Sequence, residues 1–154
     1  MTKGLPSDTV AEVRDRCLCL AAQRAARALA RRFDRALAPV GLTNRQFSLL
    51  MALIRAEAPR ISDLAAFLVM DRTTLTAALK PLERRGLVEV RPDKQDRRNR
   101  RLSLSVAGVE LLGRALPLWR AAHDALDDAV PEVAQAELRG ALVALADARV
   151  AGAG

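Results

Sequence analysis

Residues 61–104, ISDLAAFLVMDRTTLTAALKPLERRGLVEVRPDKQDRRNRRLSL, decide the fold of this chain. Ser62 stands before apolar residues at helical spacing, so we expect a short helix that this serine caps. A second helix is expected over residues 72–86, because Asp71 can cap its first amides and Gly86 can end it. Two helices joined by the short break at 69–71 predict a helix-turn-helix.

The second of these helices has two chemically different faces. With a period of 3.6 residues, one face of the helix is apolar and comprises Leu75, Ala78, Leu79 and Leu82. The other face is small, hydroxyl-rich and basic, and comprises Arg72, Thr73, Thr76, Ala77 and Lys80. Such a face can enter a major groove, where hydroxyls and arginine contact base edges and cations contact phosphates. An ordinary solvated helix face is the alternative.

Two strand-like segments follow, at 87–91 and 101–105, and a loop at 92–100 crowded with cations separates them. We interpret them as a β-hairpin wing. Residues 71–101 contain ten Lys or Arg against five Asp or Glu, so a net +5 of the chain's +7 lies there. A local positive charge of this kind is typical of duplex binding, since neutralised phosphates release counterions.

The segments before this unit are expected to be mainly helical. Apolar spacing predicts one long helix from Thr9 to near Pro39. Thr43 and Gln46 can form a capping box for a helix over 43–57, which Pro59 ends. The apolar face of that helix is expected to be Phe47, Leu50, Met51 and Ile54. Residues 60–61 are expected to add a third small strand to the wing.

The segments after the wing are also expected to be helical. Pro81 lies inside the second helix of the helix-turn-helix, which we keep as one helix. Ser105 can cap a further long helix with a coiled-coil-like apolar seam and a kink at Pro117. The seam is Val109, Leu112, Leu116, Trp119, His123, Leu126 and Val130. Pro131 suits the first position of a last helix over 131–149.

The expected fold is mainly α with a small β wing. Residues 42–105 form the winged helix-turn-helix, and residues 9–41 and 106–150 form a helical dimerisation region intertwined with it. The terminal helices cannot bury their apolar faces against one small winged helix, so a two-fold homodimer is the economical solution. Its symmetry predicts a pseudo-palindromic site on double-stranded DNA, with half-sites about 34–36 Å apart.

Six short motifs give the chain a resemblance to a known family. They are 41–50 with its Gly-Leu-Thr start, 61–65, 70–76, 82–88, 96–98 and 104–108. In these motifs the chain resembles the MarR family of transcriptional regulators, which are dimeric winged-helix repressors or activators. The resemblance implies the same dimer and a role as a DNA-binding regulator, with repression as our expectation.

The expected DNA contacts lie at the start of the second helix and in the wing. Base-facing or phosphate-facing residues are Arg72, Thr73, Thr74 and Thr76, and Lys80 is expected to reach phosphate. The resemblance implies that Arg98 enters the minor groove and that Asp96 orients it. Arg97 and Arg100 are alternatives for that role, and a sheet-packing salt bridge is the alternative for any one arginine.

Two triggers for regulation are open. One is a small aromatic or amphipathic effector in a crevice between the dimer helices and the winged helix. Its candidate lining is Phe47, Trp119, His123 and Arg24, although Trp119 and His123 on an apolar seam are also compatible with plain core.

The other trigger is oxidation of Cys17 or Cys19. Cys19 lies near the position where the organic-hydroperoxide-sensing branch of the family keeps its reactive cysteine, but this chain has no tyrosine to supply that branch's phenolic partners. Arg14, Arg16 and Arg24 are candidates to lower a thiol pKa. Two thiols one residue apart on a helix point about 200° apart, which argues against an intrachain disulfide. Inert thiols are the alternative.

Composition restricts the other classes of function. With 154 residues, 51% of them apolar and 28% charged, the chain has the make-up of one ordinary globular domain. No signal peptide or membrane span is visible, so the expected location is the cytoplasm. One histidine and two cysteines suggest no metal site, cofactor or catalytic set. The alternatives are a winged helix for non-specific DNA binding or protein contacts and, more remotely, a thiol peroxidase.

Overall fold

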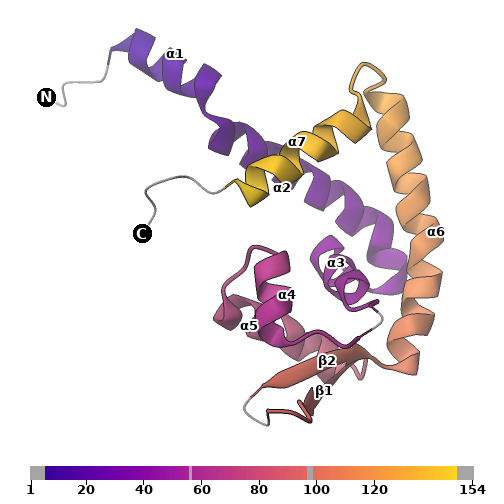
Figure 1. Ribbon diagram of the computed structural model, residues 1–154. Helices are drawn as coiled ribbons and strands as arrows, with labels where there is room; N and C mark the ends of the chain where they lie inside the picture. The colour runs from indigo at the N-terminus through magenta and orange to yellow at the C-terminus, as the bar shows by residue number, and fades with distance from the viewer. Residues whose placement is uncertain (1–5, 56, 97–98, 149–154) are drawn as a thin grey trace, which may run out of the picture.

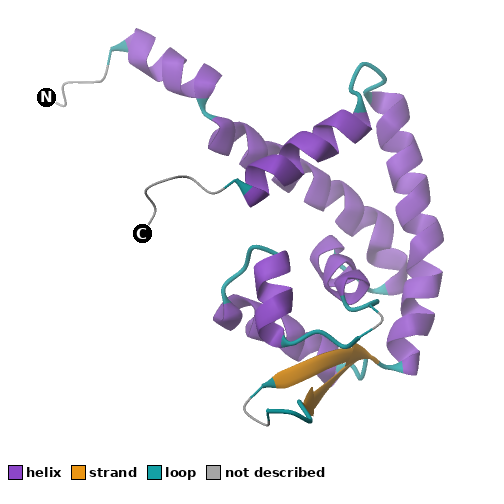
Figure 2. Ribbon diagram, in the orientation of Figure 1, coloured by secondary structure: helices purple, strands orange, loops and turns teal. Residues whose placement is uncertain are grey.

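The computed structural model describes residues 6–55, 57–96 and 99–148. Its elements in chain order are α1 Ser7–Arg16, α2 Leu18–Leu37, the 3-10 turn η1 Ala38–Val40, α3 Asn44–Ala52, α4 Ile61–Phe67, α5 Arg72–Arg84, β1 Val88–Pro92, β2 Arg100–Leu104, α6 Val106–Ala129 and α7 Gln135–Asp147. Helices α3, α4 and α5 and the hairpin gather into a head, from which α2 and α6 extend (Figure 1). The expected fold class, mainly α with a small β wing, is confirmed (Figure 2). No helix within the described ranges is long and apolar enough to cross a membrane.

The core lies inside the head and at its junction with α2 and α6. Its fully buried leucines come from the end of α2 and from every part of the head, namely Leu37, Leu50, Leu64, Leu75, Leu82 and Leu102. Leu75, Leu79 and Leu82 are all buried, so the predicted apolar face of α5 is the face that packs. The opposite face of α5 is therefore free to meet solvent or a ligand.

The first helix of the helix-turn-helix begins two residues earlier than its sequence suggested. The carbonyl of Arg60 accepts hydrogen bonds from the amides of Asp63 and Leu64, both at 3.1 Å, so Arg60 occupies the N-cap position of α4. The expectation that Ser62 caps this helix is wrong, and its hydroxyl donates to Asp63 instead, at 3.3 Å. Arg60 takes the position because a β-bridge to Arg101 already fixes its backbone.

The ends of α5 follow the prediction. The Asp71 carboxylate accepts from the Thr74 amide at 2.8 Å, which is an N-cap bond. Gly86 ends the helical region with φ +69°, a left-handed conformation that favours glycine. Pro81 lies inside α5, which stays one helix. The turn before α5 contains Val69 at φ +52°.

The wing is a two-stranded antiparallel hairpin in which Val88 pairs with Leu104 and Pro92 with Arg100. The first strand, 88–92, lies one residue later than predicted, and the second, 100–104, lies one residue earlier. The expected third strand at 60–61 is reduced to the single bridge between Arg60 and Arg101.

Helix α3 is shorter than predicted. The capping box of Thr43 and Gln46 is present with both hydrogen bonds, at 3.2 and 3.1 Å. The helix nevertheless ends at Ala52, because the Leu53 amide bonds to the Leu50 carbonyl and tightens the last turn. Met51 and Ile54 are exposed, so the expectation that they join the core face is wrong.

The predicted long N-terminal helix is divided into two. Cys17 has an extended backbone with ψ 99°, and its amide closes α1 on the Val13 carbonyl at 3.0 Å. Its sulfur accepts from the Leu20 amide at 3.3 Å and so caps α2. The expectation of one continuous helix from Thr9 is therefore wrong. Farther along, the Arg32 guanidinium donates to the Ala125 carbonyl at 2.8 Å and joins α2 to α6.

Helix α6 starts as predicted, because the Ser105 hydroxyl accepts from the Gly108 amide at 3.0 Å. It continues through Pro117 to Ala129, with Leu112 of the expected seam buried and Val109 exposed. Helix α7 begins at Gln135, so the expectation that Pro131 opens this helix is wrong. Turns at 131–133 precede it, and none of its described residues is buried.

Candidate nucleic-acid interface and effector pocket

The exposed face of α5 presents most of the residues expected to contact DNA. Arg72, Thr73, Thr74, Thr76 and Lys80 are all exposed, on the side of the helix opposite its buried leucines. The face combines two cations with three hydroxyl groups on a rigid helix packed into the core. It therefore has the shape and the chemistry to enter a major groove.

The three threonines are not equivalent. The Thr74 hydroxyl donates to Asp71 Oδ2 at 2.5 Å, and the Thr76 hydroxyl donates to the Arg72 carbonyl at 2.7 Å. Within the described part of the chain, the Thr73 hydroxyl donates no hydrogen bond. A hydroxyl has one hydrogen to donate, so Thr74 and Thr76 can only accept from a base while Thr73 can donate or accept.

Asp71 is held as a carboxylate by the helix that it caps. The Thr74 hydroxyl lowers the pKa of Asp71 most, and the Thr74 amide lowers it further. The negative charge therefore persists at the N-terminus of α5, where it is favourable toward the helix dipole. The same charge would repel a phosphate group placed close to Asp71.

The wing carries exposed cations of its own. Arg100 is exposed at the start of β2, and Lys94 is exposed in the hairpin loop. The Asp96 carboxylate accepts from the Asn99 side-chain amide at 3.1 Å, and its carbonyl accepts from the Asn99 backbone amide at 2.8 Å. Arg97 and Arg98 lie outside the described residues, so the role expected for Arg98 stays a prediction.

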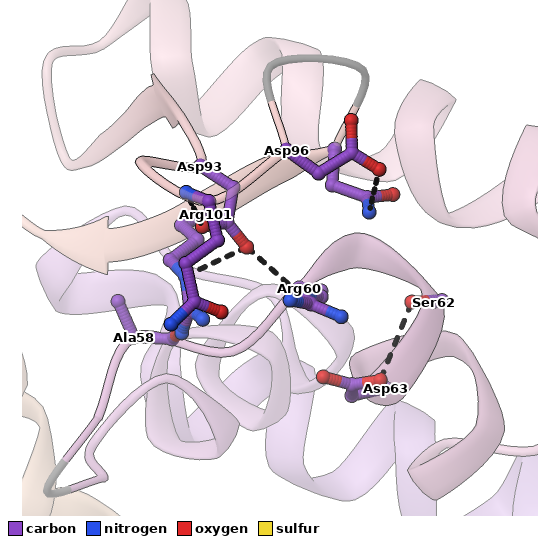
Figure 3. Close-up of polar contacts among 9 residues, drawn as sticks. Ala58, Arg60, Ser62, Asp63, Asp93, Asp96 and Arg101 are labelled. Carbon is purple, nitrogen blue, oxygen red and sulfur yellow. Dashed lines mark hydrogen bonds and ion pairs between the residues drawn. The ribbon is translucent and has the colours of Figure 1, made fainter.

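Sequence reasoning missed Asp93, a buried carboxylate at the base of the wing. Arg60 Nε and Arg101 Nε lie 2.8 and 3.1 Å from its Oδ2, and the Gln95 amide donates to its Oδ1 at 3.0 Å (Figure 3). The Gln95 amide is the largest cause that lowers the pKa of Asp93, with Arg60 and Arg101 adding to it against the effect of burial. Its two arginine partners lie on other segments, so no local sequence signal marks the burial of this carboxylate.

An apolar pocket of about 410 Å³ opens between the head and α6. Its lining is Phe47, Ser48, Met51, Ala52, Phe67, Leu68, Leu116 and Trp119. Phe47 and Trp119 stack with ring centroids 6.0 Å apart, so the structure brings these two expected lining residues together. At its rim, the Arg55 guanidinium lies 4.5 Å from the centre of the Phe67 ring.

The other two residues expected in this pocket lie elsewhere. His123 packs behind Trp119, with ring centroids 4.2 Å apart, and against Phe33, at 4.6 Å. Burial lowers the pKa of His123, and Asp127 opposes that effect. Arg24 lines a separate shallow groove on α2 with Arg27 and small residues. The expectation that Arg24 and Phe47 share one pocket is therefore not met within this chain.

One cysteine lies at the interruption of the N-terminal helix and the other just after it. Cys17 is partly exposed at the break, and Cys19 is exposed in the first turn of α2. Because Cys17 is not helical, the expected 200° separation of the two thiols does not apply. Arg14 and Arg16 form ion pairs with Asp15 and Glu12, both at 2.7 Å, so their charges are directed to these acids.

Comparison with known proteins identifies the family. Residues 42–99, which include α3, α4, α5 and β1, match the model of the MarR family. The transcriptional regulator MosR of M. tuberculosis, solved in complex with DNA, is 37% identical, with 84% of this chain and 93% of MosR covered and a TM-score of 0.73. The chain belongs to the MarR family. The resemblance drawn from its motifs is confirmed.

Two other relatives of this MarR-family chain are also regulators. CouR from Rhodococcus jostii RHA1, solved with bound p-coumaroyl-CoA, is 26% identical, with 88% of this chain and 96% of CouR covered and a TM-score of 0.73. The transcriptional activatory protein BadR of Rhodopseudomonas palustris is 39% identical over 77 residues, which are 48% of this chain and 44% of BadR. The chain spans about half the length of the curated relatives it matches.

Proposed function

We propose that this MarR-family protein is a homodimeric transcriptional regulator, acting as a repressor, that binds a pseudo-palindromic operator in double-stranded DNA. The observation that carries the proposal is the exposed basic and hydroxyl face of α5, a helix whose opposite face is buried in the head. The same head carries a cation-rich hairpin. DNA complexes of MosR and CouR support it.

In this proposal each part of the head has one task. The start of α5 lies in the major groove, where Thr73 and Arg72 contact base edges. Lys80, two turns farther along, contacts phosphate. The wing reaches the adjacent minor groove, and Arg98 enters it with Asp96 as its orienting carboxylate.

Homodimerisation is supported by the terminal helices. No residue of α1 or α7 is buried, although both carry large apolar side chains. The exposed ones are Val10, Val13, Leu138, Leu142, Val143 and Leu145. A second copy that covers them would also set the distance between two heads. Sedimentation should give a dimer, and a lone subunit that still footprints a palindrome would contradict this part of the proposal.

The decisive experiment is capture of genomic duplexes followed by titration of the selected site. We expect a preference of ~10³ or more over unrelated DNA, with an affinity that falls steeply with salt. Lys80→Ala tests the α5 face, and Arg120→Ala, an exposed cation on α6, is its charge-matched control. Equal affinity for all sequences would favour a non-specific DNA-binding module, and indifference to salt would reject duplex binding.

We further propose that a small aromatic or amphipathic effector occupies the pocket lined by Phe47 and Trp119 and favours a dimer geometry that releases the operator. The apolar lining supports this ligand class. Trp119 is the sole tryptophan, so binding should change the intrinsic fluorescence. Ala52→Phe, which fills the pocket, should abolish both the fluorescence change and the release. An effector that releases the wild type and Ala52→Phe equally from the operator would exclude this pocket as its site.

Oxidation of Cys17 or Cys19 is the second candidate trigger, favoured by the exposure of Cys19 beside an interrupted helix. Titration of free thiols with peroxide, while operator binding is followed, tests it. Loss of binding in the wild type but not in Cys17→Ser or Cys19→Ser would support a sensor. Full oxidation with unchanged binding would exclude one.

We assign the protein to the cytoplasm and to regulation rather than catalysis. The relatives named above are transcriptional regulators, which supports both assignments. Turnover of peroxide without affinity for any duplex would favour the thiol peroxidase alternative instead.

A further inference from the structure

Asp93 is the one charged side chain that is buried among the residues the structure describes, with 2% of its surface exposed. A buried carboxylate is costly unless charged groups and hydrogen bonds compensate it. Here Arg60 and Arg101 both face Oδ2, and the Gln95 amide satisfies Oδ1. The two arginines are about one third exposed, so the cluster lies at the edge of the head.

The three donors come from three different segments. Arg60 precedes α4 and Arg101 lies on β2 (Figure 3). Gln95 belongs to the hairpin loop. Two hydrogen bonds to backbone carbonyls run beside them. Arg101 Nη1 donates to the Ala58 carbonyl at 2.8 Å, and the Leu102 amide donates to the Pro59 carbonyl at 3.0 Å. One carboxylate therefore fastens the base of the wing to the segment that leads into the helix-turn-helix.

Asp93 also shapes the loop that it opens. Its amide donates to the Asn99 carbonyl at 2.9 Å, which closes the loop across its base. Lys94 directly follows Asp93, and Arg100 directly follows Asn99. The backbone bond between Asp93 and Asn99 thus places these two exposed cations beside the base of the loop, next to the buried carboxylate.

We propose that Asp93 is a positioning residue for operator recognition, which fixes the wing relative to α4 and α5 so that both can engage one half-site together. It contacts no DNA itself. By pairing with Arg60 and Arg101 it also directs these two cations inward, which leaves the cations of the loop to meet phosphate. The inference rests on the proposed DNA-binding function.

Stability alone is a weak explanation of this cluster. Desolvation of a buried ion pair offsets much of its Coulombic attraction, and apolar residues of similar volume stabilise a fold at least as well. Charged hydrogen bonds differ from apolar contacts in being directional. The two oxygens of the Asp93 carboxylate join three segments, so this cluster is suited to fixing the relative orientation of those segments.

The test compares Asp93→Asn with Asp63→Asn. Both substitutions raise the net charge by one, but Asp63 is exposed on α4 and accepts a hydrogen bond only from Ser62 within the described residues. We expect Asp93→Asn to lose about tenfold or more in operator affinity, and Asp63→Asn to bind as tightly as the wild type or more tightly. Affinity for unrelated duplex should rise equally in both, since counterion release follows the charge.

Hydroxyl-radical footprints separate positioning from simple loss of folded protein. Asp93→Asn should lose protection at the outer flanks of the operator, where the wing lies, and keep protection at the α5 contacts. Uniform weakening of the whole footprint, or wild-type affinity in folded Asp93→Asn, would overturn the proposal.

Arg101→Lys decides the question if Asp93→Asn does not fold. It keeps the charge, but a single ammonium nitrogen cannot occupy both positions from which Nε and Nη1 bond to Asp93 and Ala58. The same selective loss of flank protection is expected, and a wild-type footprint would reject the proposal. The wild type is measured first. If it prefers no duplex sequence, the proposed function fails, whereas a specific wild type with unaffected variants refutes only the role of Asp93.

Discussion

Gly108, in the first turn of α6, tests how tightly that helix is joined to the head. A Cβ at this position would lie 2.3 Å from the Leu87 carbonyl oxygen, 3.2 Å from its carbon and 3.3 Å from Leu104 Cδ2. Ordinary contacts between such atoms need about 3.5 Å, so Gly108→Ala must move α6 or the start of β1 by roughly 1 Å.

The energetic cost follows from what that movement disturbs. Overpacking a tight site costs about 1–3 kcal/mol. The Leu87 carbonyl also accepts from the Ser105 amide at 3.1 Å, and weakening this bond adds about 1 kcal/mol. Alanine regains about 1 kcal/mol of helix propensity. We therefore expect Gly108→Ala to lower the free energy of unfolding by about 1–3 kcal/mol.

Gly113 is the matched control, since it lies in the same helix and nothing stands within 4 Å of an added Cβ. Gly113→Ala should stabilise the protein by about 0.5–1 kcal/mol through helix propensity alone. Urea unfolding at one fixed protein concentration measures both variants, because dimerisation makes apparent stability depend on concentration. If Gly108→Ala were as stable as Gly113→Ala, the close approach of α6 to β1 would be refuted.

Four further outcomes are expected. Lys80→Ala should weaken binding to all duplexes and reduce the salt slope by about one, whereas Arg98→Ala should cost about 1–3 kcal/mol of operator affinity, both read from titrations at several salt concentrations. Thr73→Val should lose about 1 kcal/mol of operator affinity, and Thr76→Val, whose hydroxyl already bonds within α5, should stay within about 0.5 kcal/mol. Because folding lowers the pKa of Asp71, its contribution to stability is present above about pH 4 and is lost as the pH falls through the folded pKa. Asn also caps helices, so Asp71→Asn should keep stability near neutral pH but flatten that acid dependence of the urea midpoint.

The accuracy of sequence reasoning depended on how local each interaction is. Thr43, Asp71 and Ser105 cap the helices that they were expected to cap, because a capping side chain bonds to an amide three residues away. Gly86 ends the helical region of α5 for a similarly local reason. The fold class could therefore be predicted from side chains that act within one helical turn.

The predictions that failed involve features without such a local signal. No proline or glycine marks the break at Cys17 or the end of α3 at Ala52, so apolar spacing extended both helices too far. The burial of Asp93 depends on Arg60, which lies 33 residues earlier in the chain. It also depends on the pairing of the two strands, whose bounds were each predicted with an error of one residue. The candidate pocket likewise needed the packing of α3 against α6.

The junction around Ser105 bears on how a signal could reach the DNA-binding surface. The Ser105 hydroxyl donates to the Gly86 carbonyl at 2.6 Å, its amide donates to the Leu87 carbonyl, and its oxygen caps α6. The end of the α5 region, the start of β1 and the start of α6 thus meet at one residue. With Gly108 packed against Leu87 as well, α6 has no room to rotate independently of the head. A rotation of α6 imposed by a partner subunit or an effector must then carry α5 with it as a rigid body. Regulation through this junction would change the distance between two recognition helices while leaving each head folded.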